Sequence, residues 1–452
     1  MQTLRFPPQI EELAQRLADV LQGSRLPLIA VDADDDVVIA LLALGLRERR
    51  GIAVVNGRGD DVTPLIGAHG FPLALVRRDA IAGEVVGELG EHVLVQTDGA
   101  ADFEDGIVLF TSGSSGERKP VKVGWDALVA CSTFMNEAME TTADDVEAIY
   151  AQLDHAFAIG RIVSCALAGA RFEVFGAAGR LTPASVQRIL DVEGLSGLAC
   201  MPSLLLRMVS IDQLRASLAA RLRYVQVGAM YLPPARKLEL VERLPDTRIF
   251  AHYGMTEYMR ATFYELSAHR GKAHTEGRAS GDTEVRIDLH DEESGMGEIQ
   301  LRGPFLADGY LDGDSWRARL TDDGFFRTGD VGQLDDDGFL IHGGRLDGVF
   351  NVHGRLFSSV KLEQDLAAAM PLLEGRICVL PFRRAEGIKD SEILVFVGGE
   401  TADDPVDRDI ARVFGQQGLQ VEVVRLPDDL PRTGTGKVAY PALREIAQAR
   451  SD

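Results

Sequence analysis

Residues 109–122, with the sequence LFTSGSSGERKPVK, concentrate side chains that suit an anion. An apolar strand runs into a loop of hydroxyls and glycines, and such a loop turns backbone N–H groups and hydroxyls toward one anion. Gly113 and Gly116 leave room for close approach, and Lys119 adds a positive charge at the rim. The glycines are three apart, so the common nucleotide-binding spacing G-x-x-x-x-G-K-S/T is not met. The residues alone leave two interpretations open, a phosphate site and a flexible turn.

A second group of candidate residues lies in IFAHYGMTEY (249–258). A predicted strand ends at Tyr253 and Gly254, and Thr256 and Glu257 follow at its carboxyl end, where α/β sheets bind ligands. A carboxylate such as Glu257 is a suitable ligand for a Mg²⁺ ion that substrate phosphates share. By itself the motif is weak.

Three further residues are candidates for a functional role, but each also has an ordinary structural interpretation. Asp330, in FRTGDVGQLDDDGF, can accept hydrogen bonds from both hydroxyls of a ribose, and the alternative is a plain turn. Lys437 lies in LPRTGTGKV, which by itself indicates a surface loop. His155 is the lone histidine of the apolar stretch 148–170, where a satisfied core histidine is the usual alternative.

Composition excludes several classes of protein. The chain has 452 residues with 47 basic against 69 acidic side chains, a net charge of −22, which disfavours general binding to nucleic acid or to an anionic membrane. Four widely spaced cysteines show neither a zinc nor a disulfide pattern and suggest buried thiols in a reducing compartment. No basic-then-apolar leader is seen, and no apolar run reaches the roughly 18 residues of a membrane helix. We expect a cytoplasmic protein.

The elements needed to position these residues follow an α/β pattern. A helix is predicted over 9–22, a strand over 27–31 and a helix over 37–46 that begins after the acidic run DADDD, followed by the strand IAVVN. Strand, helix and strand at this spacing indicate a parallel sheet covered by helices.

Later segments change character. Short strands separated by Asp/Gly turns over 284–342 indicate a small β-rich subdomain. A small C-terminal domain begins near residue 348, and its first helix is predicted to start with a cap made by Ser358 or Ser359 together with Glu363.

Taken in order, these motifs resemble the signatures of the adenylate-forming superfamily, which includes acyl- and aryl-CoA synthetases, nonribosomal peptide adenylation domains and luciferases. TSGSSGERK resembles the phosphate loop, YGMTE resembles YGxTE, and GEIQLRGPFLADGY resembles the GE-x-x-x-RG…GY stretch. FRTGD, GGRLDGVFNVHG and LPRTGTGK resemble the motif ending in Thr-Gly-Asp, the hinge and the closing lysine motif. The resemblance covers about residues 106–440.

The resemblance implies a nucleotide site. The residues expected to bind the phosphates are Thr111, Ser112, Gly113, Ser114, Ser115, Gly116, Lys119 and Thr256. Those expected around the adenine are Tyr253 with Gly254, and Gly228, Ala229 and Met230, whose backbone also lies against the acyl group. Asp330 and Arg345 are expected at the ribose, Arg345 at the ribose or a phosphate.

The resemblance also implies catalytic roles. Glu257 holds Mg²⁺ on the phosphates of ATP, and Lys437 reaches the carboxylate and the α-phosphate. His155 falls in the segment that carries a gate beside the carboxylate pocket, and Asp347 is the hinge. The implied fold is a large N-terminal domain (1–345) of parallel and mixed sheets with helices and the β-rich subdomain, followed by a small, mobile α+β domain (346–452).

Three departures from the family pattern bear on function. Arg118 stands where proline usually precedes the lysine of the phosphate loop. Asn351 stands where the hinge motif usually has lysine, which puts the thioester-forming step in question. About 105 residues precede the phosphate loop, fewer than most members carry, so a trimmed N-terminal subdomain is expected.

The implied reaction is ATP-dependent activation of a small carboxylic acid to an acyl-adenylate, followed by transfer to the thiol of CoA or of a carrier protein's phosphopantetheine. Residues 156–170 contain no carboxylate to hold an amine, which favours an aryl or acyl substrate. Asp154 keeps open the alternative of a stand-alone amino-acid adenylation enzyme. A non-catalytic nucleotide-binding relative is the third alternative.

Overall fold

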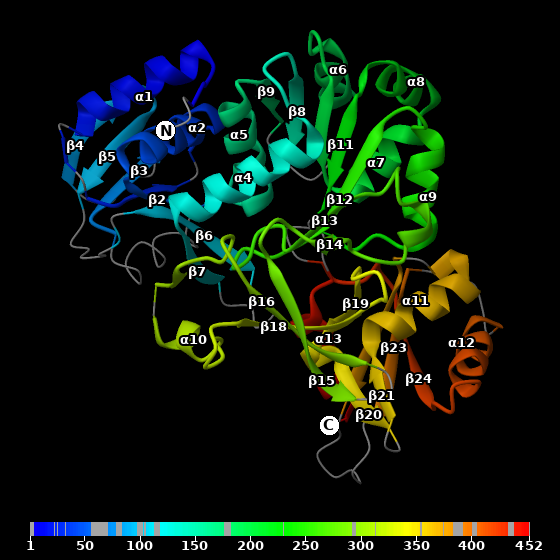
Figure 1. The fold of residues 1–452 in the computed structure, drawn as a ribbon. Helices are drawn as coiled ribbons and strands as arrows, with labels where there is room; N and C mark the ends of the chain where they lie inside the picture. Colours follow the sequence, from blue (N-terminus) through cyan, green and yellow to red (C-terminus); the bar gives the residue numbers. More distant parts are fainter. Residues whose placement is uncertain are drawn as a thin grey trace. The chain divides into compact units, whose positions relative to one another are not determined.

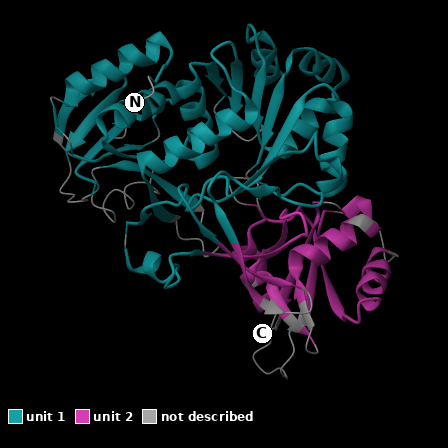
Figure 2. Ribbon diagram, in the orientation of Figure 1, with its two compact units in different colours: residues 1–112, 118–285, 301–326 teal, residues 113–117, 286–300, 327–452 magenta. Residues whose placement is uncertain are grey.

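The computed structural model describes the chain except for residues 1–3, 22, 25, 32, 56–70, 78–83, 97–102, 104, 113–117, 176–181, 229, 292–294, 312, 353–354, 374, 383–391, 400–404, 433–437 and 452. At some further positions, including Ser112, Arg118, Asp347 and Asn351, it describes the backbone alone. The chain divides into two compact units (Figure 2): unit 1 contains residues 1–112, 118–285 and 301–326, and unit 2 contains residues 113–117, 286–300 and 327–452.

Within the described residues, the first sheet of unit 1 has eight strands in the order β17-β7-β6-β2-β1-β3-β5-β4 (Figure 1). They are β1 (Leu28–Val31), β2 (Gly51–Val55), β3 (Leu73–Arg77), β4 (Glu84–Leu89), β5 (His92–Gln96), β6 (Gly106–Ser112), β7 (Arg118–Val123) and β17 (Gly309–Tyr310). The central strands β3, β1, β2 and β6 run parallel, and the outer pairs are antiparallel. β1 and β2 are buried at every position, as apolar strands covered on both faces are.

The second sheet of unit 1 has seven described strands in the order β14-β13-β12-β11-β10-β8-β9. They are β8 (Val146–Tyr150), β9 (Arg171–Val174), β10 (Gly197–Cys200), β11 (Tyr224–Val227), β12 (Arg248–Tyr253), β13 (Thr262–Glu265) and β14 (Arg278–Ala279). β11 and β12 are parallel neighbours, so their carboxyl ends meet at one edge of the sheet. The chain leaves this edge at Gly228 and at Gly254.

The α-helices described in unit 1 pack on these sheets or on their edges. They are α1 (Pro8–Leu21), α2 (Asp35–Glu48), α4 (Trp125–Met139), α5 (Ala156–Ala168), α6 (Pro183–Asp191), α7 (Pro202–Val209), α8 (Asp212–Arg221), α9 (Pro234–Arg243) and α10 (Asp314–Arg317). α4 and α5 lie between the two sheets (Figure 1). Trp125 of α4 packs so closely on α2 that a Cβ at Gly45 would come within 2.6 Å of its ring. On the other side, Ser132 of α4 donates a hydrogen bond to the carbonyl of Gly160 in α5 at 3.2 Å.

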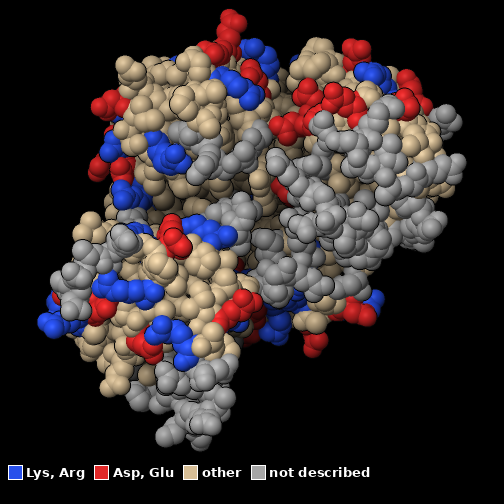
Figure 3. Space-filling view, turned by 180° about the vertical axis from the view of Figure 1, so that it is seen from behind, with Lys and Arg blue, Asp and Glu red and all other residues tan. Residues whose placement is uncertain are grey.

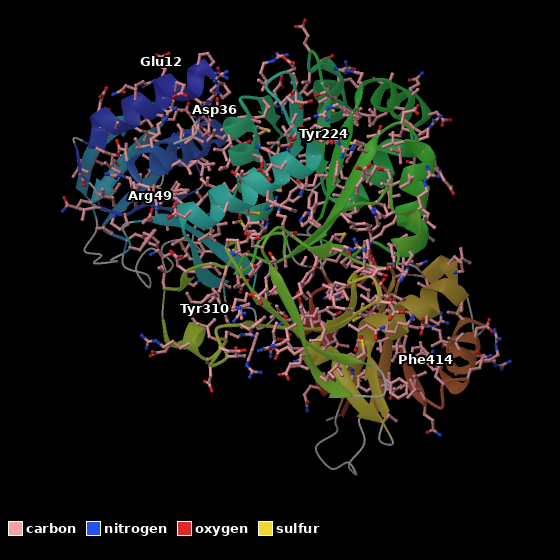
Figure 4. The ribbon with its side chains drawn as sticks, in the orientation of Figure 1. Glu12, Asp36, Arg49, Tyr224, Tyr310 and Phe414 are labelled. Atoms are coloured by element: carbon pink, nitrogen blue, oxygen red, sulfur yellow. The ribbon has the colours of Figure 1, made fainter. Side chains whose placement is uncertain are left out.

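Unit 2 contains most of a four-stranded sheet in the order β15-β16-β18-β19. It also contains the hairpin β20-β21 and a three-stranded sheet in the order β22-β23-β24. The strands are β15 (Glu284–Asp291), β16 (Met296–Arg302), β18 (Phe326–Leu334), β19 (Leu340–Arg345), β20 (Val349–Val352), β21 (Arg355–Ser358), β22 (Ile377–Phe382), β23 (Glu392–Gly398) and β24 (Val421–Leu426). Its helices are α11 (Ser359–Ala369), α12 (Pro405–Gly415) and α13 (Tyr440–Ser451). One apolar cluster joins the three-stranded sheet to α11 and α12, where Phe414 is labelled in Figure 4, and a second joins its other face to α13.

The predicted α/β fold class is confirmed. α1, β1 and α2 occur where the periodicity predicted them, and α2 begins at Asp35 within the acidic run. The four cysteines are free and buried. Among the helices that the structure describes, none has the length and apolar character needed to cross a lipid bilayer. The described part of the face in Figure 3 carries acidic and basic side chains side by side.

One local prediction is wrong. Ser358 caps α11 by accepting a hydrogen bond from the backbone N–H of Lys361, but Glu363 takes no part in the cap. Its Oε1 instead accepts a hydrogen bond from the backbone N–H of Val379 in β22, at 2.7 Å. A capping box needs its carboxylate at N3, which is Lys361 here; Glu363 lies two residues further along the helix and bonds to the neighbouring strand instead.

Candidate active site

The arms of the phosphate loop are strands β6 and β7, which pair antiparallel with Thr111 opposite Lys119. The Thr111 hydroxyl lies 3.5 Å from the carbonyl of Lys119, at the limit of a weak hydrogen bond. Five of the predicted phosphate-binding positions, Gly113, Ser114, Ser115, Gly116 and the side chain of Ser112, lie outside the described residues. The described part of the loop therefore presents Thr111 and Lys119 at the open ends of two paired strands.

The motif YGMTE forms a tight turn after β12. Reciprocal backbone hydrogen bonds of 3.0 and 3.2 Å join Met255 and Tyr258, so Thr256 and Glu257 occupy the two middle positions. Gly254 allows the returning chain to approach, because a Cβ there would lie 2.5 Å from the backbone nitrogen of Arg260. Sequence reasoning placed these two side chains at the end of a strand, and the structure presents both at the tip of one turn.

A short segment of chain links this turn to the phosphate strands. The backbone N–H of Ala307 donates to the carbonyl of Glu257 at 2.9 Å, and Tyr310 pairs with Val121 of β7. The side chain of Tyr310 continues the link, because its hydroxyl donates a 2.7 Å hydrogen bond to Oε1 of Glu257. Lys119 Nζ lies 5.7 Å from the centroid of the same ring. Figure 4 shows Tyr310 below β7 and beside α10.

The carboxyl end of β11 approaches that of β12 at Gly228. A Cβ at this position would come within 1.9 Å of the ring of His252, so only glycine fits there. The His252 ring stacks on Phe157 of α5 with centroids 5.6 Å apart. Burial, together with the charge of Arg260, lowers the pKa of His252 well below its ordinary value, so the imidazole is neutral. Ala229 lies outside the described residues.

His155 is the N-cap residue of α5, and its side chain is 38% exposed. Its Nε2 lies 3.2 Å from Oε1 of Gln152 and 3.8 Å from Asp154, so the alternative of a buried core histidine does not hold. Arg260 ties this end of α5 to the turn after β12 by donating to the carbonyls of Ala156 and Phe157, at 2.9 and 2.8 Å. The structure thus brings the start of α5 and the carboxyl end of β12 together.

Unit 2 brings two of the predicted nucleotide-binding residues together. Asp330 of β18 lies directly opposite Arg345 of β19, and Arg345 Nη1 lies 3.0 Å from Oδ1 of Asp330. His342 Nε2 lies 3.7 Å from the other carboxylate oxygen. Asp347 follows in a 3₁₀ turn (Leu346–Gly348), with its side chain outside the described part, as is all of Lys437.

Comparisons with known proteins identify related sequences and structures. The model of the family described as AMP-binding enzyme matches residues 91–311. The long-chain-fatty-acid–CoA ligase of Thermus thermophilus is 25% identical over 381 residues, which are 80% of this chain and 69% of that protein. The structure of an ATP-bound RpMatB–BxBclM chimera has a TM-score of 0.80 and 19% identity, and the match covers 98% of this chain and 93% of that one.

The chain belongs to the adenylate-forming superfamily. A third relative, the indoleacetate–CoA ligase of Aromatoleum aromaticum, is 26% identical over 353 residues, 76% of this chain and 68% of that protein. The protein is accordingly an adenylate-forming enzyme of the acid–thiol ligase, acyl-CoA synthetase-like class.

The described residues of this adenylate-forming enzyme fit a magnesium ion held mainly by its substrate. They contain no group of three or more His, Cys, Asp or Glu side chains that would hold a metal on its own. Glu257 is partly exposed, and Tyr310 occupies one of its two oxygens. A single carboxylate shared with phosphate oxygens is how Mg²⁺ is commonly bound at nucleotide sites.

Sequence reasoning missed four residues of the adenylate-forming enzyme that the structure places among the predicted ones: Tyr310, His252, Arg260 and His342. Tyr310 ends the motif GEIQLRGPFLADGY, so the sequence marked its position but assigned it no function. His252 and Arg260 flank YGMTE, and a register shift between β18 and β19 at Val331 and Gly332 brings His342 near Asp330. Their contacts depend on tertiary packing, which local patterns do not reveal.

Proposed function

We propose that this enzyme activates a carboxylic acid with MgATP and passes the acyl group to a thiol. A carboxylate oxygen attacks the α-phosphorus, the bond to the β-phosphate breaks, and pyrophosphate leaves with its electron pair. The thiolate sulfur of the acceptor then attacks the acyl carbon, and AMP departs. The observation that carries the proposal is the joining of Lys119 of the phosphate strands to Glu257 of the YGMTE turn through Tyr310.

Charge neutralisation and in-line positioning dominate such a nucleotidyl transfer. Lys119 and Thr111 serve the phosphates, and Thr256 contacts them from the tip of the turn. Glu257 would hold Mg²⁺, which would supply positive charge to the phosphate oxygens. Lys437 serves the α-phosphate and the substrate carboxylate.

The remaining groups orient the nucleotide. Asp330 accepts hydrogen bonds from the ribose hydroxyls, and Arg345 supports that carboxylate from 3.0 Å. Tyr253, Gly254 and the backbone at Gly228 flank the adenine. The large domain (1–345) holds ATP and the acid, and the small domain (346–452) turns about Asp347 between the two half-reactions.

The proposed substrate is an aryl or acyl acid without an α-amine. α5 is apolar and buried from Phe157 to Ala166, and its only charged residue in that stretch, Arg161, is paired with Glu147. An ammonium group of an amino acid would have to rely on Asp154, whose side chain is 15% exposed and lies 3.8 Å from His155. Two relatives bear the names of a fatty-acid ligase and an indoleacetate ligase, which fits this class.

The proposed acceptor is CoA or a carrier-protein phosphopantetheine. Asn351 stands in place of the hinge lysine at the position where the family builds its thioester-forming conformation. Retention of Glu257, Asp330 and Lys437 supports catalysis over a non-catalytic role, because Glu257 and Lys437 serve the reacting phosphate and carboxylate groups and Asp330 serves the ribose.

Pyrophosphate release with MgATP, measured across a panel of aryl, fatty and amino acids with hydroxylamine to trap the adenylate, tests this function. Release that depends on an aryl or fatty acid is the expected result. Release with amino acids alone would replace the proposed substrate class, and ATP binding with no release across the panel would favour the non-catalytic alternative.

A further inference from the structure

The segment from Leu306 to Leu311 is hydrogen-bonded on both sides. On one side it meets the YGMTE turn, where Tyr258 and Leu306 form an antiparallel bridge next to the bond between Ala307 and Glu257. On the other side it pairs with β7, where the N–H of Asp308 donates to the carbonyl of Lys122 at 2.9 Å. The backbone of this segment therefore fixes the phosphate strand and the turn relative to each other.

The side chain of Tyr310 also connects the turn to the phosphate strand, because it contacts one charged group on each: Glu257 on the turn and Lys119 on β7. Its hydroxyl is bonded to Glu257, and Lys119 Nζ lies 5.7 Å from the centre of its ring. No ion pair within 4.0 Å joins Lys119 and Glu257, two residues that the structure describes with their side chains. The ring therefore lies in contact with both charges while they remain unpaired with each other.

The ring of Tyr310 is held firmly. It is 7% exposed and meets the ring of Trp316 edge-on, with centroids 5.2 Å apart. Trp316 in turn stacks on Phe326 at 4.8 Å. An aromatic residue clamped in this way keeps its hydroxyl at a fixed position, so the carboxylate that accepts from it is also fixed.

We propose that Tyr310 is a positioning residue that orients the Glu257 carboxylate toward the bound metal and keeps Lys119 from pairing with it. The inference rests on the proposed function, because it assigns Mg²⁺ to Glu257 and the phosphates to Lys119. An opposed ammonium and carboxylate that reach contact neutralise each other, and neither then serves MgATP at full strength. With Oε1 occupied by Tyr310, Oε2 of Glu257 has no partner among the described residues and remains the oxygen for a metal ion.

The Tyr310→Phe variant keeps the ring and removes the hydrogen bond. Nucleotide binding is measured by calorimetry in the absence of any acid, first as the Mg²⁺ concentration that half-saturates ATP binding and second as the affinity for AMP. We expect the Mg²⁺ requirement to rise about tenfold, the value of a hydrogen bond to a charged group, while AMP affinity stays within about twofold. An unchanged Mg²⁺ requirement, or an equal loss of AMP affinity, would overturn the proposal.

Two further variants distinguish an effect on the orientation of Glu257 from a general effect of losing a buried tyrosine hydroxyl. Tyr264→Phe is the matched control, because Tyr264 is also buried, lies 6.0 Å from the ammonium of Lys237 and donates to the carbonyl of Thr275 at 3.3 Å. It is expected to leave both binding constants unchanged. In a Glu257→Gln background, Tyr310→Phe is expected to change the Mg²⁺ requirement by less than about twofold, since its effect acts through the carboxylate. A full tenfold effect in that background would also contradict the proposal.

These measurements separate this inference from the proposed function. An enzyme that binds MgATP but activates no acid would contradict the proposed function and leave the test of Tyr310 intact. A wild-type enzyme that binds no MgATP would contradict both.

Discussion

Asp330 and Arg345 lie opposite each other on β18 and β19, with their side chains 3.0 Å apart. Asp330 is 5% exposed, and the backbone N–H of the same residue is bonded to the hydroxyl of Thr328 at 3.0 Å. A buried carboxylate held by an arginine on one oxygen is a rigid hydrogen-bond acceptor, which is what recognition of a diol requires.

Asp330→Asn tests recognition of the ribose. The amide loses the charge and one acceptor, so we expect kcat/KM for ATP to fall by about tenfold or more. Because the contact is to a ribose hydroxyl, the wild-type preference for ATP over 2′-deoxy-ATP should disappear in the variant. If the variant kept the wild-type preference for ATP over 2′-deoxy-ATP, Asp330 would not be the residue that binds the ribose.

Lys437→Ala tests the closing lysine. This residue lies outside the described part of the chain, so the expectation rests on the motif LPRTGTGKV. Adenylate formation should be abolished while ATP affinity stays within a few-fold of the wild type, since the ammonium acts on charge that develops during the reaction. Equal losses in affinity and in turnover would make Lys437 a binding residue.

The pair Glu147–Arg161 fixes α5 on β8. Both side chains are fully buried, Arg161 Nε donates to Glu147 Oε1 at 2.8 Å, and the Tyr224 hydroxyl donates to the other oxygen at 2.7 Å. Arg161→Met leaves a buried carboxylate without its cation, so we expect a loss of about 3–5 kcal/mol in the free energy of unfolding. The double variant Glu147→Leu, Arg161→Met should be the more stable of the two in urea denaturation. If Arg161→Met alone were neutral, the pair would not hold the helix.

Glu363 gives the C-terminal region a pH-dependent stability. Burial raises the pKa of this carboxyl from 4.5 to about 7. A carboxyl whose pKa is raised by folding binds its proton more tightly in the folded state. Its stabilising effect is complete below about pH 4.5 and is lost as the pH rises to about 7. The protection of the β22 amides against hydrogen exchange should therefore fall across this interval.

Glu363→Gln removes this dependence. The variant keeps an oxygen acceptor for the N–H of Val379, so protection of β22 should be nearly flat between pH 4.5 and 7 and exceed that of the wild type at the upper end. The exposed Glu445→Gln in α13 serves as the control and should behave as the wild type does. Equal pH profiles for wild type and Glu363→Gln would contradict the account.

The parts that could be predicted from the sequence are those with local causes. The strands β6 and β12, with Thr256 and Glu257 just after the end of β12, follow from apolar runs that lead into glycines and hydroxyls in one stretch of chain. Tyr310 could not be assigned, because its partner Glu257 is 53 residues away and the two meet only when the segment at β17 pairs with β7. Glu363 is a second example: the local sequence predicted a role in a helix cap, but in the fold its carboxylate accepts a hydrogen bond from strand β22.

The most direct test of the central claim is transfer of an isotope from the acid to AMP. An active acid labelled with ¹⁸O in both carboxylate oxygens is incubated with enzyme, MgATP and CoA or hydroxylamine, and the products are analysed by mass spectrometry. Attack of the carboxylate on the α-phosphorus predicts one labelled oxygen in AMP and none in pyrophosphate. Label in orthophosphate or pyrophosphate, with unlabelled AMP, would show that the acid is activated at another phosphorus and would contradict the account.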